Sequence, residues 1–178
     1  MHRERGFTLL ELLVSLAVAG VLATVAIPDF AAMLRHDRAV TAVNVLAGAL
    51  NFARASAISR NSYVTLCHSA DGSRCDSSHG WESGWLVFIN LDRDSPAQVD
   101  AGEPILHVHA SLTGGARILG NRAAFTFRPL GVRSTNGTLL YCSAGGEHDR
   151  ALVVSVTGRI RLADPATLDN GMSCGSSQ

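Results

Sequence analysis

The sequence contains no lysine, so all 15 of its basic residues are arginines. The planar guanidinium group suits phosphates and carboxylates, although a GC-rich coding bias gives the same composition. Acidic residues also number 15, and a formal net charge of 0 excludes a polybasic surface that binds nucleic acid or membranes by bulk charge. Charged residues make up only 17% and hydrophobic residues 47%. This balance is typical of a globular domain with a membrane segment attached.

Catalytic motifs are missing as well. The sequence has no nucleophile elbow, no phosphate-binding loop and no paired acid motif. We therefore expect neither an enzyme nor a cofactor. A length of 178 residues is enough for one domain with a sizeable core, but not comfortably for two.

An apolar run extends from Phe7 to Ile27, and Glu11 is its one charged residue. A helix of this length rises about 30 Å, which is the thickness of the hydrocarbon core of a bilayer. The preceding segment, Met1–Gly6, is short and basic and would stay in the cytoplasm, which sends the rest of the chain outward. An ordinary N-terminal signal anchor would also explain this pattern.

Glu11 is the residue that a simple anchor does not explain. A carboxylate about one turn inside an apolar span costs roughly 2.5–3.5 kcal/mol, so we expect it to have a partner. Cleavage between Gly6 and Phe7 would create an ammonium group four residues before Glu11. The new amine of one subunit would then pair with Glu11 of its neighbour when the helices bundle.

The residues R-G-F-T-L-L-E that end at Glu11 resemble the class III signal of type IV pilins and type II secretion pseudopilins. The resemblance implies that a prepilin peptidase cuts after Gly6, that Phe7 is then methylated, and that Glu11 guides subunit docking. Gly20 and Pro28 fall where this family has a helix-weakening glycine and a kinking proline.

The apolar spacing predicts one helix from about Phe7 to Ser59, followed by short β-type runs broken by glycine and asparagine. The expected fold class is α+β: a long N-terminal helix, transmembrane in its first half, packed on an antiparallel β-sandwich-like head. The expected divisions are a leader (1–6), a transmembrane helix half (7–27), an amphipathic helix half (28–60) and a β-rich globular head (61–178). The expected strands are Tyr63–His68, Trp85–Asn90, Ile105–His109, Ala116–Leu119, Ala124–Arg128, Thr138–Cys142, Leu152–Val156 and Arg159–Leu162.

The middle of the chain carries a second resemblance. The strand Gly84-Trp85-Leu86-Val87-Phe88 is followed by an acidic turn at Asp92–Asp94. This combination resembles the GspH/FimT branch of minor pilins. Together with the N-terminal signal it implies a pilin fold.

Four cysteines fit two disulfides if the chain leaves the cytoplasm. Locality favours Cys67 with Cys75 and Cys142 with Cys174, although four cysteines allow three connectivities. In an oxidising compartment, each bond would stabilise the head by about 2–4 kcal/mol.

We considered metal sites and predict none. Cys67, His68, Cys75 and His79 have the ligand chemistry for zinc but lack the close ligand pairs of zinc sites. Asp92, Asp94, Asp100 and Glu103 supply oxygen ligands for calcium but lack the regular spacing of a calcium loop, so a solvated turn is favoured there. Two histidines that alternate along one strand are more typical of ordinary surface or core residues. These two histidines are His107 and His109.

The run Gly158-Arg159-Ile160-Arg161 gives the sharpest functional prediction. Residues two apart on a strand point the same way and lie about 7 Å apart, close to the phosphate spacing along one nucleic-acid strand. Arg159 and Arg161 would project together while Ile160 turns to the core and Gly158 allows a tight turn. Such a pair suits backbone contacts without reading sequence.

This run is similar to the G-R-x-R signature of FimT-type minor pilins, which implies DNA capture during natural transformation. We expect Arg150 to extend the patch. Four more arginines would add to it if the fold brings them to the same side: Arg117, Arg122, Arg128 and Arg133. The alternative is a solvated pair of arginines matched by Asp149 or Asp164.

The combined prediction is a FimT-like minor pilin, a single-pass inner-membrane protein with its head in the periplasm, later built into a pilus at the cell surface. Its expected partners are other pilins through the N-terminal helix, prepilin peptidase and DNA. Removal of the leader changes the formal charge from 0 to −1, so DNA affinity should be modest and salt-sensitive. The alternatives are a structural minor pilin, an H-type pseudopilin of a type II secretion system, or an anchored metal-dependent periplasmic enzyme.

Overall fold

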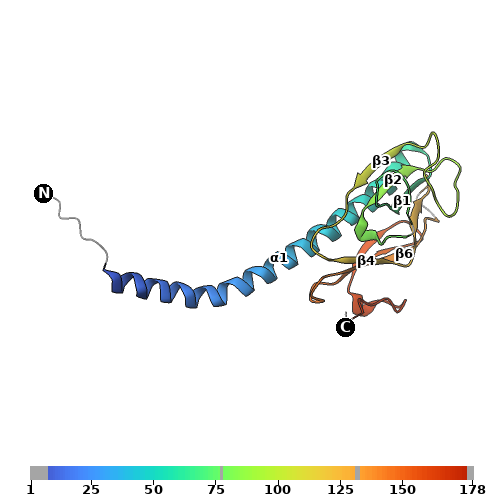
Figure 1. The fold of residues 1–178 in the computed structure, drawn as a ribbon. Helices are drawn as coiled ribbons and strands as arrows, with labels where there is room; N and C mark the ends of the chain where they lie inside the picture. The colour runs from blue at the N-terminus through green and yellow to red at the C-terminus, as the bar shows by residue number, and fades with distance from the viewer. Residues whose placement is uncertain (1–7, 77, 131–132, 176–178) are drawn as a thin grey trace. The chain divides into compact units, whose positions relative to one another are not determined.

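The computed structural model describes residues 8–76, 78–130 and 133–175, without the side chains of residues 25, 26, 28 and 29 (Figure 1). The predicted processing site at Gly6 and Phe7 and the side chain of Pro28 therefore lie outside the described part. The chain divides into two compact units, Met1–Asp37 and Arg38–Gln178. Helix α1 (Leu9–Arg60) runs through both.

Helix α1 begins with a capping box. The hydroxyl of Thr8 accepts a hydrogen bond from the backbone nitrogen of Glu11 at 3.2 Å, and the Glu11 carboxylate lies 3.4 Å from the backbone nitrogen of Thr8. This reciprocal arrangement satisfies backbone donors that have no partner within the first helical turn. Within the described side chains, no helix meets the length and apolarity required to cross a membrane.

Helix α1 ends in a left-handed residue. Asn61 has φ of +50°, and its backbone nitrogen donates to the carbonyl of Ile58. The nitrogen of Ser62 donates to the carbonyl of Ala57 at 3.2 Å. This pair of bonds is the Schellman arrangement that closes helix C-termini, and asparagine tolerates the required φ.

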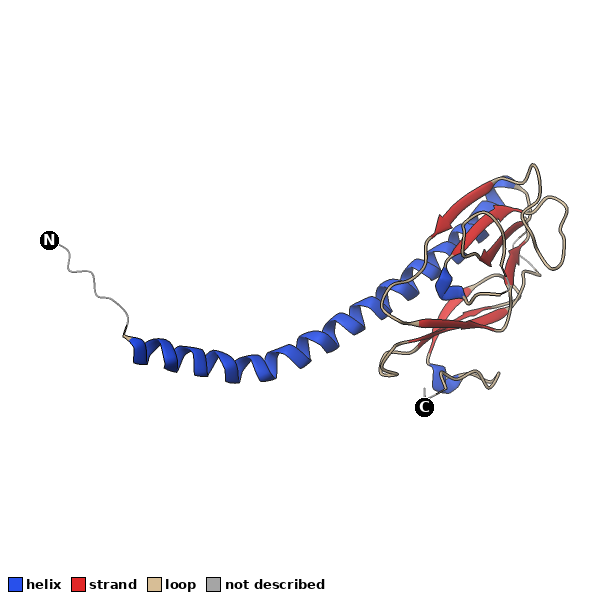
Figure 2. Cartoon of the chain, in the orientation of Figure 1, coloured by secondary structure: helices blue, strands red, loops and turns tan. Residues whose placement is uncertain are grey.

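Two antiparallel four-stranded sheets follow α1 (Figure 2). The first has the order β3-β2-β1-β5 and the second the order β4-β6-β7-β8. A short 3₁₀ helix, η1 (Trp81–Ser83), precedes β2, and η2 (Pro165–Thr167) follows β8. The strands are β1 (Val64–His68), β2 (Trp85–Ile89), β3 (Ile105–His109), β4 (Arg117–Gly120), β5 (Ala124–Phe127), β6 (Gly137–Cys142), β7 (Arg150–Val154) and β8 (Ile160–Ala163).

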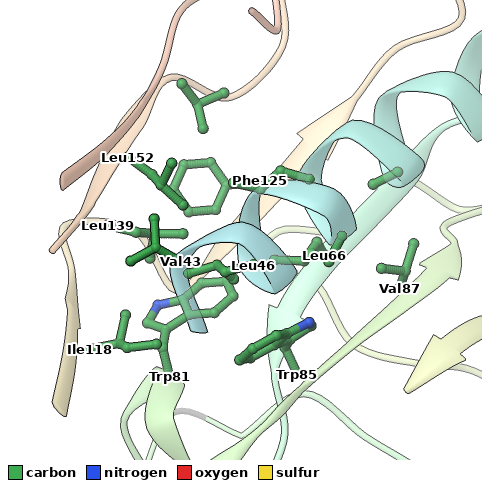
Figure 3. Packing of buried hydrophobic residues seen from close by; sticks show 14 of the residues in the cluster. Val43, Leu46, Leu66, Trp81, Trp85, Val87, Ile118, Phe125, Leu139 and Leu152 are labelled. Carbon is green, nitrogen blue, oxygen red and sulfur yellow. The ribbon is translucent and has the colours of Figure 1, made fainter. Parts of the chain in front are cut away.

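The main core forms between α1 and both sheets. In Figure 3, Val43 and Leu46 of α1 lie among side chains from the first sheet, including Phe125, and from the second, including Leu139 and Leu152. Leu46 is 1% exposed and Phe125 is completely buried. The apolar stripe predicted on the second half of the helix is therefore core packing, as expected for an amphipathic helix.

The predicted α+β class, the long helix and all eight strands are confirmed. The bounds of β3 are as predicted and those of the other elements differ by one or two residues, most at β7, which was expected at Leu152–Val156 and is found at Arg150–Val154. The reason is local, because Ser155 and Val156 enter a turn instead of extending the strand. The short helices η1 and η2 were not predicted.

Both favoured disulfides are present. Cys67 bonds to Cys75, and Cys142 bonds to Cys174. No free cysteine is found among the described residues. Cys67 and Cys75 are therefore not available as thiolate ligands, and the zinc alternative is wrong in this respect.

Candidate nucleic-acid interface

The strands β7 and β8 are joined by a hairpin turn that Ser155 and Gly158 hold in place. The nitrogen of Gly158 donates to the carbonyl of Ser155 at 2.8 Å, and the nitrogen of Ser155 donates to the carbonyl of Arg159 at 3.0 Å. Gly158 has φ of +71°, a conformation that side chains rarely adopt. This is the three-residue loop with a glycine bulge that suits the twist of antiparallel strands.

Gly158 also lies in close contact with its surroundings. A Cβ at this position would be 3.0 Å from the Ser134 hydroxyl oxygen and 3.3 Å from both Phe127 Cδ1 and Arg54 Nε. The nitrogen of Ser134 donates to the carbonyl of Val156 at 2.8 Å. The glycine of the motif is thus required twice, for the turn and for the close approach of the turn to the chain around it.

Arg159 and Arg161 are both exposed, while Ile160 between them packs against the main core. Arg161 is paired with Val153 across the strands, so its side chain leaves the outer face of the second sheet, and Arg159 lies in the turn directly before β8. Strand β8 is the edge of that sheet. The exposure of both arginines and the packing of Ile160 against the core are confirmed, and the shared direction of Arg159 and Arg161 stays a prediction.

The carboxylates proposed as partners of these arginines accept hydrogen bonds from other residues close to them in the sequence. Asp149 Oδ1 accepts from the nitrogen and hydroxyl of Ser143, and Asp164 Oδ1 accepts from the nitrogen of Ala166. Across the described ranges, neither Arg159 nor Arg161 has a carboxylate within ion-pair distance. The geometry therefore does not favour the alternative in which Arg159 and Arg161 are a solvated pair matched by Asp149 or Asp164.

Arg150 does not extend the patch. Its strand neighbours Leu152 and Val154 face the main core, and side chains two apart on a strand share a face. Arg150 therefore lies on the inner face of the second sheet, at the end of β7 that is far from the turn. Its Nη1 donates to the carbonyl of Asp149. The expectation is corrected by strand register, because Arg161 pairs with Val153 and not with an inner-face residue.

The four additional arginines lie at different places. Arg117 shares the outer face but begins β4, three strands from β8, or about 14 Å away across the sheet. Arg122 donates to the carbonyl of Asn136 at 3.1 Å. Arg133 is exposed and directly precedes Ser134, which is bonded to the hairpin turn. Arg128 follows β5 and lies over the ring of Tyr63.

The C-terminal segment covers part of the same outer face. Leu168, Met172 and Cys174 pack against Cys142 and its buried neighbours on β6 and β7. The side chain of Asn170 donates to the hydroxyl of Thr138 at 2.9 Å. Arg161 lies on the edge strand β8 next to this covered region, and Arg159 directly precedes that strand.

A pair of arginines on one tyrosine was not predicted from the sequence. Arg93 Cζ lies 4.5 Å from the centroid of the Tyr63 ring, and Arg128 Cζ lies 5.7 Å from it. The three residues are far apart in the sequence and belong to no motif. Arg93 also has φ of +63°, which no sequence pattern indicated.

The acidic turn brings three predicted oxygen ligands together. One carboxylate oxygen each of Asp92, Asp94 and Asp100 lies within 4.8 Å of the others. Glu103 instead accepts from the backbone nitrogens of Leu91 and Asp100. Partial desolvation and the neighbouring carboxylates, first that of Asp92, raise the pKa of Asp100.

The remaining candidate ligands have other contacts. Burial lowers the pKa of His68, which packs on Trp81 with ring centroids 5.2 Å apart. The ring of His79 bonds to the carboxylate of Asp76. His109 stacks on the buried ring of Trp85 at 4.1 Å, and His107 makes an edge contact with Phe52.

Comparison with known proteins gives consistent relatives. A family model of the type II transport protein GspH matches residues 42–158, and a model of the prokaryotic N-terminal methylation motif matches residues 1–27. The chain is 32% identical over 169 residues to the pilin-like protein PilA1 of Thermus thermophilus, covering 89% of this chain and 98% of that protein.

Two solved structures share the fold. The type IV minor pilin FimU of Pseudomonas aeruginosa PAO1 is 20% identical with a TM-score of 0.53, over 76% of this chain and 92% of that one. The minor pseudopilin EpsH of the Vibrio cholerae type 2 secretion system is 14% identical with a TM-score of 0.50, over 72% and 98%.

Proposed function

Since this chain belongs to the GspH family and is a minor pilin or pseudopilin, we propose that it is built into a type IV pilus and binds DNA there. The proposed contact is to the DNA backbone, without sequence preference, through Arg159 and Arg161. The observation that carries it is that both arginines are exposed, Arg161 on the outer face of the edge strand β8 and Arg159 directly before that strand. Within the described chain, both also lack a carboxylate partner.

Assembly forms the first part of the proposal. Prepilin peptidase cuts between Gly6 and Phe7, the new N-terminus is methylated, and the mature subunit joins other pilins through its N-terminal helix. The match of residues 1–27 to the methylation motif supports this step. Before assembly, the apolar run Phe7–Ile27 crosses the inner membrane once, with the head in the periplasm.

The DNA contact is electrostatic and weak. Arginine pairs that meet phosphates release counterions, so affinity falls steeply with salt. The mature chain has a formal charge of −1 from its sequence, and bulk attraction to DNA is absent. Affinity therefore depends on the local arginines, and DNA uptake would rely on many subunits or on other pilus proteins. The role is binding and assembly, with no chemical reaction.

The test uses the full-length chain in nonionic detergent and a fluorescent 30-bp duplex, with binding followed by anisotropy across a salt series. The double variant Arg159→Ala/Arg161→Ala should weaken binding at least tenfold and lower the slope of log affinity against log salt by about 2. The matched control is Arg74→Ala/Arg117→Ala, which removes the same charge at two sites away from β8 and should stay within twofold of wild type. Equal affinity and slope for the double variant and wild type would reject the DNA role.

The second candidate is a structural pilin or an H-type pseudopilin of a type II secretion system. The family model that matches residues 42–158 carries the description of a type II transport protein, GspH, and this description favours the second candidate. It predicts assembly without any effect of Arg159 and Arg161 on DNA. Deletion of the gene would then impair secretion or piliation and leave DNA uptake unchanged.

A further inference from the structure

The cluster of Tyr63, Arg93 and Arg128 has no role in the fold core. Tyr63 is half-buried and lies one residue before β1, and Arg128 lies one residue after β5. Val64 and Phe127 are paired across β1 and β5, so Tyr63 and Arg128 occupy the same end of the first sheet. Arg93 arrives from the loop after β2 and has the shorter contact with the ring.

The two guanidinium groups are held by the ring and not by carboxylates. Within the described ranges, neither Arg93 nor Arg128 has an ion-pair partner. A guanidinium on an aromatic face keeps its N–H donors at the rim, where they remain available to an acceptor. Arg93 and Tyr63 also line a pocket of about 320 Å³ together with Asn61, Ser62, Asn90, Leu91 and Pro129.

This cluster lies close to the hairpin of Arg159. A Cβ on Gly158 would be 3.3 Å from Phe127 Cδ1, and Arg128 follows Phe127 directly. Adjacent Cα atoms are 3.8 Å apart, so the Cα atoms of Arg128 and Arg159 are separated by about 16 Å at most. Neighbouring phosphates on one DNA strand lie about 7 Å apart, the spacing already compared with Arg159 and Arg161, so a Cα separation of at most about 16 Å corresponds to about three phosphates on one strand.

Acidic residues flank Arg93 and work against a polyanion. Asp92 Oδ1 accepts from the nitrogen of Asp94, and Asp94 accepts from Asn90 and from the nitrogen of Gln98. Each of these two carboxylates accepts at least one hydrogen bond from its own loop, and a carboxylate oxygen of Asp100 lies within 4.8 Å of one from each, while the guanidinium of Arg93 is directed onto Tyr63. The loop therefore lowers the overall affinity without neutralising Arg93 by an ion pair.

We infer that Arg93 and Arg128, oriented by Tyr63, form a second phosphate-contacting site that continues the track of Arg159 and Arg161 along one strand of duplex DNA. This inference rests on the proposed DNA function and names further residues for it. Tyr63 is a positioning residue, because its ring holds the guanidinium groups and does not itself contact the phosphate.

The experiment uses the same detergent-solubilised full-length chain and 30-bp duplex. The variant Arg93→Asn/Arg128→Gln removes both guanidinium groups, and asparagine suits the positive φ at residue 93. We expect about tenfold weaker binding and a salt slope lower by about 2. The control Arg74→Gln/Arg117→Gln removes the same charge at two sites outside the track and should change affinity less than twofold.

The role of Tyr63 is tested by a pair of variants. Tyr63→Phe keeps the ring and should bind DNA as wild type does, whereas Tyr63→Leu should weaken binding about threefold or more with both arginines still present. Equal binding by both variants would remove the positioning role.

The outcomes separate this inference from the function on which it rests. Loss of binding in Arg159→Ala/Arg161→Ala with unchanged affinity and slope in Arg93→Asn/Arg128→Gln overturns the second site and leaves the proposed function standing. If neither double variant changes DNA binding, both the second site and the proposed DNA function are rejected. A loss in the control equal to that in Arg93→Asn/Arg128→Gln also overturns the second site, since total charge would then account for it.

Discussion

The carboxylate of Glu11 lies 3.4 Å from both the backbone nitrogen and the hydroxyl of Thr8. A residue predicted to meet an amine of a neighbouring subunit thus also caps its own helix. The two roles depend on different properties of the side chain. Capping needs a hydrogen-bonding group at this position, which glutamine also supplies, whereas pairing with an ammonium group needs the negative charge.

Exchange of Glu11 for glutamine separates these roles. Glu11→Gln should keep the helical content of the purified chain, measured by circular dichroism in detergent. It should also reduce the subunit found in sheared filaments by tenfold or more, because the docking charge is gone. Thr8→Val is the control, because it loses the cap and keeps the charge, and it should still assemble. Normal assembly of Glu11→Gln would mean that Glu11 acts only as a cap.

Replacement of Gly158 by alanine should destabilise the head. The left-handed φ costs a side chain about 1–2 kcal/mol, and the contacts of 3.0–3.3 Å that a Cβ would make add about 1–3 kcal/mol. Gly146 has nearly the same φ, +72°, and a Cβ added there would have nothing within 4 Å, so Gly146→Ala should cost only the backbone part. Denaturant unfolding of both variants measures the difference. Equal losses would show that the turn alone, and not its packing, requires glycine.

Removal of the two disulfides should have unequal effects. Cys142 and Cys174 are 32 residues apart, and Cys67 and Cys75 are 8 apart. Loop-closure entropy then gives stabilisations of about 4 and 2.5 kcal/mol. Chemical denaturation of Cys142→Ala/Cys174→Ala and of Cys67→Ala/Cys75→Ala should follow this order. A larger loss for the shorter loop would contradict the entropic reasoning.

Asp100 should make the stability of the head depend on pH. Its pKa is raised in the folded chain, so the ionised form is disfavoured there. The resulting destabilisation is present above the folded pKa and disappears as the pH falls below the unfolded value of about 3.9. Asp100→Asn should therefore raise the melting temperature at pH 7 in the presence of a chelator, and the gain should vanish near pH 3. A gain of the same size at both pH values would point to a cause other than charge.

The sequence predicted the elements well because each had a local cause. Helix α1 carries a continuous apolar period, and the strands are short apolar runs between glycine and asparagine residues. The disulfides followed from proximity along the chain. The capping box at Thr8 and Glu11 was also visible as a T-x-x-E pattern, although the prediction for Glu11 concerned only a charged partner.

The candidate site was predicted only in part, since register and distant contacts are not local. Whether Arg150 shares a face with Arg161 depends on the number of residues in one turn, and a shift of one residue reverses the answer. The contacts of Arg93 and Arg128 with Tyr63 join three separate loops, and no spacing rule relates them. The exposure of Arg159 and Arg161 was predicted because they alternate with Ile160, which packs against the core, although Arg159 lies in the turn before β8 and not in the strand.

The bond between Cys142 and Cys174 has a mechanical consequence. Residues 142–174 form a covalently closed ring that contains both strands of the arginine hairpin. If DNA held at Arg159 and Arg161 is pulled, the tension enters an outermost strand that is hydrogen-bonded on one side only. Peeling of this strand releases only chain within the ring, and the tension then passes through the disulfide to Cys142 on β6.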